Sequence, residues 1–248
     1  MQGGFHFVEY GVNTLNKPKL VIFDAGKTLL NYLDVDMIRG VRAYMEYLTA
    51  NPGNLTAEEI RREDNAVFGE FEHCRRNLFE VPAQTVLQLV FDRLKLKFSI
   101  SIQEIERMIW ENDANIVPVE GAKELLDHLN SMGIRTAVIS NLDFSGYLLE
   151  ERLNQLYPNN RFEFVIASSD YGVRKPRKLL FEVGIAMSGL KPEEIWYVGD
   201  KVKVDVEGSR ACGMVPVLYK SAYNQYGETP ADVLTVEHYA RLIERLAF

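Results

Sequence analysis

Polar residues follow a short apolar run, directly or closely, at four points along the chain. They are Asp24 after LVIF, Ser140 and Asn141 after TAVI, Lys175 after FVIASS, and Asp200 and Asp205 after IWYVG. Each has an ordinary explanation as a helix cap, a turn residue or a solvated charge. In an open parallel sheet, however, ligands bind beyond the carboxyl ends of the strands. Four polar strand ends in succession therefore indicate one shared site.

These residue types suit the transfer of a phosphoryl group. A carboxylate such as Asp24 can attack phosphorus and form an aspartyl-phosphate, which divides one difficult step into two. The carboxylate and the phosphoryl group are both anionic, so a cation must reduce their repulsion. Mg²⁺ bound by Asp24 and Asp200 would do so, with Asp205 as a further or orienting carboxylate.

The remaining polar residues would act on the phosphoryl oxygens. Lys175 would neutralise negative charge. The hydroxyls of Ser140 and of Thr28, which follows Asp24 by four positions, would donate hydrogen bonds. We place Asn141 in the same catalytic set.

The tripeptide Gly26-Lys27-Thr28 suggests a different chemistry, because it resembles the end of a nucleotide-binding P-loop. That loop needs a glycine five positions before the tripeptide, so that backbone N–H groups can surround the phosphates. The residue there is Val21, inside KLVIF, a continuous apolar run typical of a buried strand. The spacing therefore excludes a P-loop.

Strand and helix patterns alternate from residue 118 onward. EGAKELLDHLNSMG predicts a helix that ends at Gly133, and RTAVIS predicts the strand after it. Further strands are predicted at FEFVIASS, IWYVG and VPVLY, with helices over about 176–188 and 203–212 and in VEHYARLIERL. This alternation predicts an α/β fold, a parallel sheet with helices on both faces.

The segment between the first strand and residue 118 is helical instead. Apolar residues at positions 35, 38, 41, 45 and 48 fall on one helix face. TAEE at 56–59 and SIQE at 101–104 are capping boxes, and Pro82 stands near the start of another amphipathic helix. Four helices with no strand among them are predicted here.

Two domains follow from these patterns. Residues 1–32 and 116–248 are expected to form the α/β core, and residues 33–115 an inserted helical module. Two connections, near residues 31–34 and 115–119, would join them in the arrangement of a hinged lid. Residues 1–17 carry little pattern and are expected to precede the first strand as an extension.

Composition limits the classes of partner. The chain has 248 residues and a net charge of −7, which argues against broad binding to nucleic acid or to an anionic membrane. No apolar run approaches the roughly 18 residues of a membrane span, and the first residues lack a secretory signal. Cys74 and Cys212 are isolated. We expect a cytoplasmic protein.

Four motifs, in order, resemble those of the haloacid dehalogenase-like hydrolase superfamily. FDAGKTLL is similar to the first motif, VISN to the second, GVRKP followed by LLF to the third, and VGDKVKVDVEGSRACGM to the fourth. The resemblance covers nearly the whole chain after residue 18. It implies an Asp24 nucleophile, a Rossmann-like core with strand order 5-4-1-2-3, and a helical cap inserted after the first motif. That order places Asp24 beside the strands of Ser140 and Asp200.

The first motif departs from the phosphatase branch of that family, which carries Asp-x-Asp. In the family the second Asp protonates the leaving group and later activates water, and its backbone carbonyl binds Mg²⁺. Gly26 stands at this position. It retains the carbonyl, so the resemblance implies metal binding by Asp24, Gly26, Asp200 and Asp205, but the general acid/base is lost. Lys27 is expected to point away from the site.

Four functions remain open. The favoured one is a Mg²⁺-dependent phosphatase, weak or specialised, that acts on a small phosphorylated metabolite through Asp24. A metal-free 2-haloacid dehalogenase also lacks the second Asp, but it does not need the acid pair Asp200 and Asp205. A phosphonate hydrolase tolerates a small residue at position 26, but it needs a cap lysine, and the two lysines of the helical module have no evident role. The fourth is a catalytically weak protein that binds a phosphorylated ligand.

Overall fold

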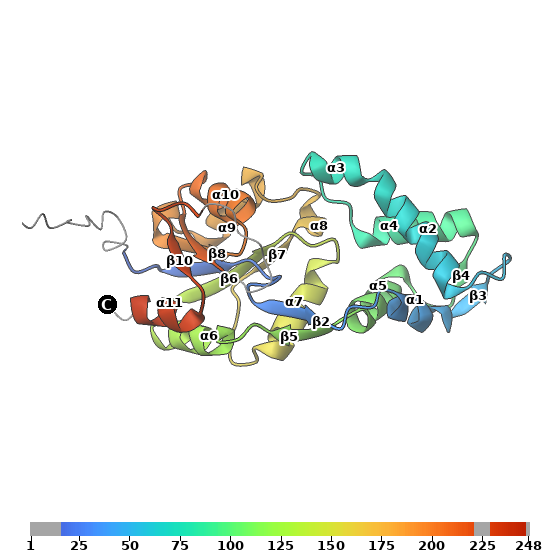
Figure 1. The fold of residues 1–248 in the computed structure, drawn as a ribbon, viewed down its shortest axis with the longest axis horizontal. Helices are drawn as coiled ribbons and strands as arrows, with labels where there is room; N and C mark the ends of the chain where they lie inside the picture. The colour runs from blue at the N-terminus through green and yellow to red at the C-terminus, as the bar shows by residue number, and fades with distance from the viewer. Residues whose placement is uncertain (1–15, 221–228, 247–248) are drawn as a thin grey trace, which may run out of the picture.

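The structure is a computed structural model that describes residues 16–220 and 229–246. Figure 1 shows two lobes: a sheet flanked by helices at one end, and a group of helices, including α1, α2 and α4, at the other. The predicted extension over residues 1–17 lies almost wholly outside the described residues.

A six-stranded sheet in the order β10-β9-β8-β1-β6-β7 forms the middle of the first lobe, and every neighbouring pair in it is parallel. Its strands are β1 (Leu20–Phe23), β6 (Arg135–Ser140), β7 (Val165–Ala167), β8 (Ile195–Gly199), β9 (Val215–Tyr219) and β10 (Leu234–Val236). The predicted fold class and the order 5-4-1-2-3 are confirmed. A sixth strand, β10, lies beside β9 and was not predicted, because three residues are too few to show an alternating pattern.

β1 is the strand that places the first candidate residue. All four of its side chains are at most 1% exposed, as expected of an apolar strand covered on both faces. It pairs with β6 on one side and β8 on the other, with Phe23 opposite both Val138 and Val198. The Asp24 N–H donates to the Val198 carbonyl at 2.8 Å, so the strand geometry continues through Asp24.

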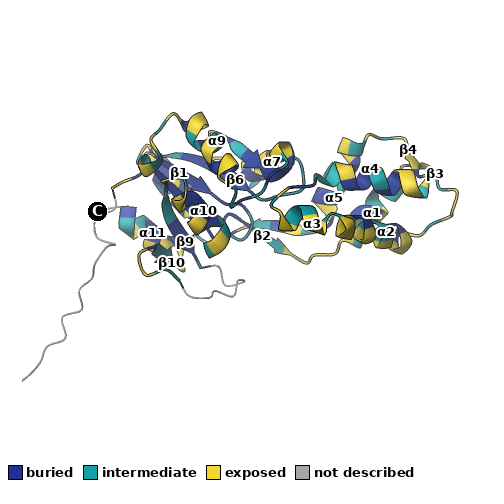
Figure 2. Ribbon diagram, turned by 90° about the horizontal axis from the view of Figure 1, so that it is seen from above, coloured by how far each residue is buried: buried dark blue, intermediate teal, exposed yellow. Residues whose placement is uncertain are grey.

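Helices cover both faces of this sheet. One hydrophobic cluster joins it to α6 (Ala122–Ser131), α7 (Gly146–Leu156) and α11 (Tyr239–Leu246). A second cluster joins the opposite face to α9 (Lys178–Ser188). The dark blue strands between yellow helix faces in Figure 2 show this layering. The prediction missed α7, and the serines at the end of FEFVIASS begin a short helix, α8 (Ser168–Tyr171), instead of ending the strand.

The helical module carries a hydrophobic cluster of its own. Its helices are α1 (Ile38–Met45), α2 (Ala57–Glu70), α3 (Glu72–Arg76), α4 (Ala83–Leu94) and α5 (Ile102–Asn112). Both capping boxes are present, Thr56 with Glu59 and Ser101 with Glu104. The prediction of four helices without a strand was wrong, because α3 separates from α2 at Phe71 and two short strands, β3 (Leu48–Ala50) and β4 (Lys97–Phe98), pair in the module.

The two connections between the lobes are not independent linkers. β2 (Leu30–Leu33) and β5 (Asn115–Pro118) pair as an antiparallel ribbon, with Leu30 opposite Pro118. Any movement of the module therefore has to bend a hydrogen-bonded ribbon. None of the helices in the described residues is long and apolar enough to span a membrane.

Candidate active site

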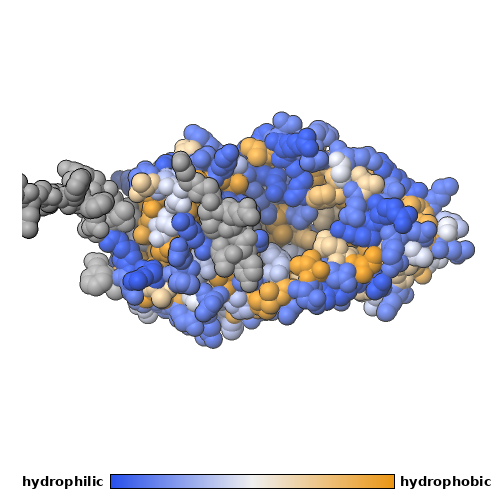
Figure 3. Space-filling view, viewed as in Figure 1, coloured by the Kyte–Doolittle hydropathy of each residue, from blue (hydrophilic) through white to orange (hydrophobic). Residues whose placement is uncertain are grey.

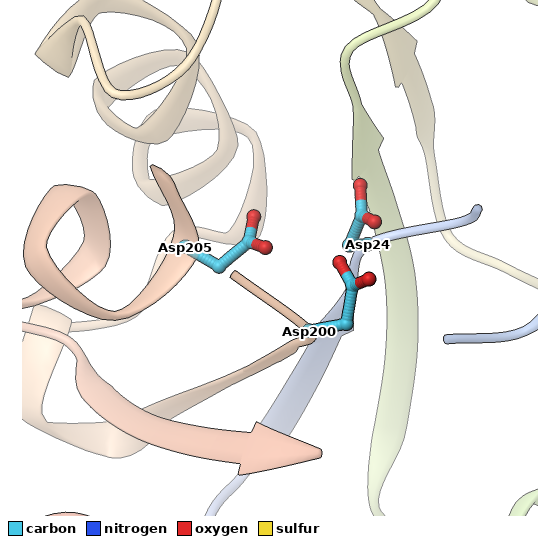
Figure 4. A group of neighbouring side chains, drawn as sticks. All are labelled: Asp24, Asp200 and Asp205. Carbon is cyan, nitrogen blue, oxygen red and sulfur yellow. The ribbon is translucent and has the colours of Figure 1, made fainter. Parts of the chain in front are cut away.

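Three aspartates meet at the carboxyl ends of β1 and β8. Asp24 follows β1, Asp200 follows β8, and Asp205 lies in the next turn. One carboxylate oxygen of each lies within 4.8 Å of those of the other two, and all three residues are buried. Figure 4 shows the Asp24 and Asp200 carboxylates close together, with Asp205 directed toward them. Gly199 permits this packing, because a Cβ there would lie 2.4 Å from Asp205 Cβ.

Lys175 connects two of these acids. Its Nζ lies 2.7 Å from Asp24 Oδ1 and 2.7 Å from Asp205 Oδ1. It also donates to Tyr197 Oη at 2.7 Å, and that hydroxyl donates to the Ile139 carbonyl at 2.8 Å. Lys175 is only 2% exposed, so it is a buried ion-pair partner and not a solvated surface charge.

Burial and charge act in opposite directions on these groups. Burial alone would lower the pKa of Lys175, but Asp205 and Asp24 outweigh it and raise this pKa well above its usual value. Burial raises the pKa of Asp205, although Lys175 acts against that shift. The ammonium group of Lys175 therefore stays charged at neutral pH beside Asp24.

Asn141 holds the backbone of Lys175. Its Nδ2 donates to the Lys175 carbonyl at 3.0 Å, and the Lys175 N–H donates to Asn141 Oδ1 at 2.7 Å. Both ends of the amide are thus engaged in fixing the loop. These contacts position the Lys175 loop, and Asn141 also lines the cavity at the site.

A cavity of about 220 Å³ opens at this edge of the sheet. It is lined by Asp24, Gly26, Lys27, Tyr32, Ser140, Asn141, Lys175, Lys201, Val204 and Asp205. Three lysines and two aspartates are thus among its lining residues, so the cavity offers positive groups to an anion beside the acids that could hold a cation. Ser140, a candidate from the sequence, also lies at its wall.

Thr28 does not line this cavity. Its side chain is fully buried, and its Oγ1 has no hydrogen-bond partner among the described residues. Its carbonyl accepts a hydrogen bond from Tyr239 Oη at 2.6 Å, which ties the turn to α11. The expectation that the Thr28 hydroxyl reaches a phosphoryl oxygen does not fit this position, and we assign the residue to packing beneath the turn.

Four residues of the site escaped the sequence analysis. Lys27, expected to point away, is among the residues that line the cavity. Lys201 also lines it, and its place directly after Asp200 was the one available signal. Tyr32 lies in β2 and Tyr197 inside β8, where each reads as an ordinary apolar residue. Nothing in their spacing connects them to Asp24.

The turn after Asp24 leaves the Gly26 backbone oxygen for a ligand. The Ala25 carbonyl accepts hydrogen bonds from the N–H groups of Thr28, Leu29 and Leu30. The Gly26 carbonyl takes part in none of these bonds, and Gly26 lines the cavity. A hard cation next to Asp24 would find this oxygen within the same turn.

The donor set fits Mg²⁺, which prefers carboxylate and carbonyl oxygens. Lys175 engages Oδ1 of Asp24, whereas Oδ2 of Asp24 accepts no hydrogen bond from the described residues. Asp205 differs, because Oδ1 accepts from Lys175 and Oδ2 accepts from the Lys201 N–H at 3.0 Å. Its contacts favour orienting the lysines over binding a metal directly.

Besides the β2–β5 ribbon, the helical module contacts the loop that carries Lys175. These contacts join residues 78–80 of the module to residues 172–174 of the core, and we call them the seam. Phe79 and Val173 form an antiparallel bridge, the Glu80 N–H donates to the Gly172 carbonyl at 3.0 Å, and the Arg174 N–H donates to the Leu78 carbonyl at 2.9 Å. The module therefore contacts the core directly, beside the residue that pairs with Asp24.

A buried carboxylate reinforces this seam. The Glu80 side chain is fully buried, and its Oε2 accepts from Ser168 Oγ at 2.5 Å and from the Arg174 guanidinium. Glu106 of α5 plays a similar part further along, where its Oε1 accepts from the Ser145 N–H at 2.8 Å. The expected picture of two connections alone is thus incomplete.

A second cavity, of about 250 Å³, lies between the module and the core. Its walls come mostly from α1, α2, α4 and α5, and the core adds Asp143 and Phe144 from the loop after Asn141. Tyr44 lines this cavity, but Arg75 and Arg76 do not. Arg75 pairs with Asp143 at 3.5 Å, and Arg76 pairs with Glu72 at the surface. In Figure 3, smaller hydrophobic patches interrupt a mostly hydrophilic surface.

A nucleophile-type aspartate at the end of the middle strand, an acid pair after the next strand and a buried lysine between them define a hydrolase of the haloacid dehalogenase-like class. A model of the haloacid dehalogenase-like hydrolase family matches residues 18–213, and the chain belongs to this family.

Similar proteins include both named hydrolases and solved structures. Haloacid dehalogenase-like hydrolase domain-containing protein 3 of Xenopus laevis is 28% identical over 79% of this chain and 82% of its own length. The glyceraldehyde 3-phosphate phosphatase of Methanopyrus kandleri is 26% identical over 80% of this chain and 82% of its own. The crystal structure of 2-haloacid dehalogenase from Pseudomonas syringae, 20% identical, covers 93% of this chain and 98% of that chain with a TM-score of 0.60. This last similarity concerns the fold.

Proposed function

We propose that this hydrolase is a Mg²⁺-dependent phosphatase that acts on a small phosphorylated metabolite. The observation that carries the proposal is the juxtaposition of Asp24 with two further acids and a buried lysine at one cavity. The similarity to a glyceraldehyde 3-phosphate phosphatase supports the same class of substrate.

Asp24 would act as the nucleophile. Its backbone continues β1, and Lys175 holds its Oδ1, so the carboxylate has one fixed orientation at the cavity wall. A bond from the carboxylate to phosphorus would form as the bond to the leaving oxygen breaks, giving an aspartyl-phosphate. Lys175 and Lys201 would face the phosphoryl oxygens, where fixed positive charge offsets the charge of the transferring group.

Mg²⁺ would be held by Asp24, Asp200 and the Gly26 carbonyl, with Asp205 oriented behind them. When bound, the ion would reduce the repulsion between the carboxylate and the phosphate. Asp205 would hold the Lys175 ammonium group and the Lys201 backbone in place beside the ion.

A metal-free dehalogenase is the second candidate, because Gly26 removes the general acid/base and the solved dehalogenase shares the fold. The buried acid triad argues against it. Attack on carbon does not call for a cation site, and the single charge of Lys175, which pairs with Asp24 and Asp205, is too small to balance three buried carboxylates.

The helical module would act as a cap that selects the leaving group. Its cavity meets the core at Asp143, two residues after Asn141 of the phosphate cavity. Mostly apolar walls with a few polar groups are typical of a small-molecule site.

Release of inorganic phosphate from a panel of phosphorylated metabolites, with and without Mg²⁺, tests the function. Asp24→Asn is the blank. Mg²⁺-dependent release that disappears in the blank is expected. Chloride release from 2-haloacids without metal, and no phosphate release, would assign the dehalogenase function instead.

A further inference from the structure

The side chain of Tyr32 lies beside Gly26. A Cβ added at Gly26 would lie 3.6 Å from Tyr32 Cε2 and 3.8 Å from Tyr32 Oη, and apart from the adjacent residues Ala25 and Lys27 no other described side chain comes within 4 Å. A carboxylate at position 26 would extend from this Cβ into the volume that the Tyr32 hydroxyl now borders. Tyr32 thus stands where the absent acid would act.

Packing fixes the ring of Tyr32, while its hydroxyl makes no hydrogen bond to the described residues. The residue lies in β2, pairs with Ile116 of β5, and packs against the main hydrophobic cluster. It lines the cavity together with Asp24. Within residues 16–220 and 229–246 the structure gives its hydroxyl no hydrogen-bond partner. A positioned phenol with a free O–H can donate to a bound ligand.

The phenol of Tyr32 carries its proton at neutral pH, because a tyrosine hydroxyl ordinarily titrates only near pH ~10. Its O–H can therefore donate to a ligand oxygen in the cavity that Tyr32 lines.

We propose that Tyr32 donates a hydrogen bond to the leaving-group oxygen and partly replaces the carboxylic acid that Gly26 lacks. This inference rests on the proposed phosphatase function. The substrates it favours are phosphomonoesters of alcohols, whose leaving oxygen develops the most negative charge.

The step balances with water as the proton source. Asp24 Oδ bonds to phosphorus, the bond between phosphorus and the leaving oxygen breaks, and its electron pair stays on that oxygen. The Tyr32 O–H stabilises this charge by a hydrogen bond, and the oxygen then takes a proton from water and leaves as the alcohol. Tyr32 keeps its own proton, so it does not activate the water that later cleaves the aspartyl-phosphate.

Tyr32→Phe tests the hydroxyl alone, because the ring that packs against the cluster is retained. Tyr47→Phe, an exposed tyrosine of the helical module, is the matched control. For both variants and the wild type, kcat and KM are measured with Mg²⁺ on a series from nitrophenyl phosphate to simple alkyl phosphates.

Tyr32→Phe is expected to leave nitrophenyl phosphate within about threefold of wild type and to lower kcat for alkyl phosphates by roughly 10²-fold. KM and the melting temperature should change little. An equal loss on every ester, or none on any, would overturn the role of Tyr32 while leaving the phosphatase function standing. No phosphate release by the wild type from any ester would overturn both.

Discussion

Lys175 Nζ lies 2.7 Å from Oδ1 of Asp24, in a position that is 2% exposed. The residue that holds the proposed nucleophile is therefore also a buried counter-charge for two carboxylates, since Asp205 pairs with the same ammonium. Under the proposed function, catalysis and folding would both depend on this one side chain. Replacing an exposed lysine with the same catalytic role would lower activity without lowering stability.

Lys175→Met is expected to lower both activity and stability. Loss of one preorganised positive group typically costs on the order of 10²–10³ in rate. Removing one partner of a buried ion pair costs about 3–5 kcal/mol of unfolding free energy, because the remaining charges are left uncompensated. A solvated lysine, the ordinary explanation from the sequence, could be replaced without loss of stability, but the burial of Lys175 excludes that explanation. Denaturant unfolding and phosphate release measure the two effects.

The double variant Lys175→Met with Asp205→Asn separates them. Neutralising Asp205 removes one of the stranded charges, so much of the stability should return while activity stays low. A double variant as unstable as the single one would contradict the assignment of Asp205 as the ion-pair partner.

The candidate site was predictable where polar residues end apolar strands. Asp24, Ser140, Asp200 and the Lys175 loop were found because β1, β6 and β8 have clear apolar runs and short, specific motifs. Burial was not predictable, so neither the buried position of the Thr28 hydroxyl nor the hydrogen bonds of Asn141 to the Lys175 backbone were foreseen.

Residues far from the motifs could not be found from the sequence. Tyr32 reaches the site only because β2 folds back beside Gly26, and Glu80 only because a helical module packs on the Lys175 loop. Tertiary packing places these side chains near the site, and the local sequence pattern does not predict tertiary packing. The short strands β3, β4 and β10 were missed for the related reason that two or three residues show no periodicity.

Asp200→Asn is expected to weaken Mg²⁺ binding by at least about tenfold, or ~1.4 kcal/mol. The wild type should also melt at a higher temperature as Mg²⁺ is added, because the ion binds only the folded site. Isothermal titration and thermal unfolding measure both without relying on activity. Asp127→Asn, an exposed acid of α6, is the control for lost charge. Equal Mg²⁺ affinity in Asp200→Asn and wild type would exclude the proposed metal site.

Glu80→Gln is expected to loosen the helical module from the Lys175 loop. The side chain keeps its shape but loses the charge that holds the Arg174 guanidinium and the Ser168 hydroxyl. A hydrogen-bonded buried group of this kind contributes about 1–3 kcal/mol. Amide exchange should speed up over residues 77–84 and 172–177, while β6 stays protected.

The matched control is Glu58→Gln, which alters an exposed ion pair with Arg42 in the same module. It should leave amide exchange at the seam unchanged. If Glu80→Gln behaves like Glu58→Gln, the module is held by its backbone contacts alone, and Glu80 has no part in positioning Lys175.

Gly26→Asp is expected to restore the missing general acid/base. The backbone tolerates the change, because a Cβ at this position makes only ordinary contacts, at 3.6 and 3.8 Å, with Tyr32. A positioned acid/base contributes roughly 10²–10⁴ in rate. The gain should be largest for alkyl phosphates, whose leaving oxygen needs the proton, and small for nitrophenyl phosphate, which leaves without one. Gly26→Ala adds the Cβ without the carboxylate and should match the wild type.

The decisive measurement is the ratio of alkyl to nitrophenyl phosphate turnover in the wild type, Gly26→Asp and Gly26→Ala, repeated with Tyr32→Phe added to each. Gly26→Asp should make that ratio insensitive to Tyr32→Phe, because the carboxylate supplies the proton that the phenol only hydrogen-bonds. A wild type that already cleaves alkyl and nitrophenyl phosphate equally fast would show that another residue protonates the leaving group.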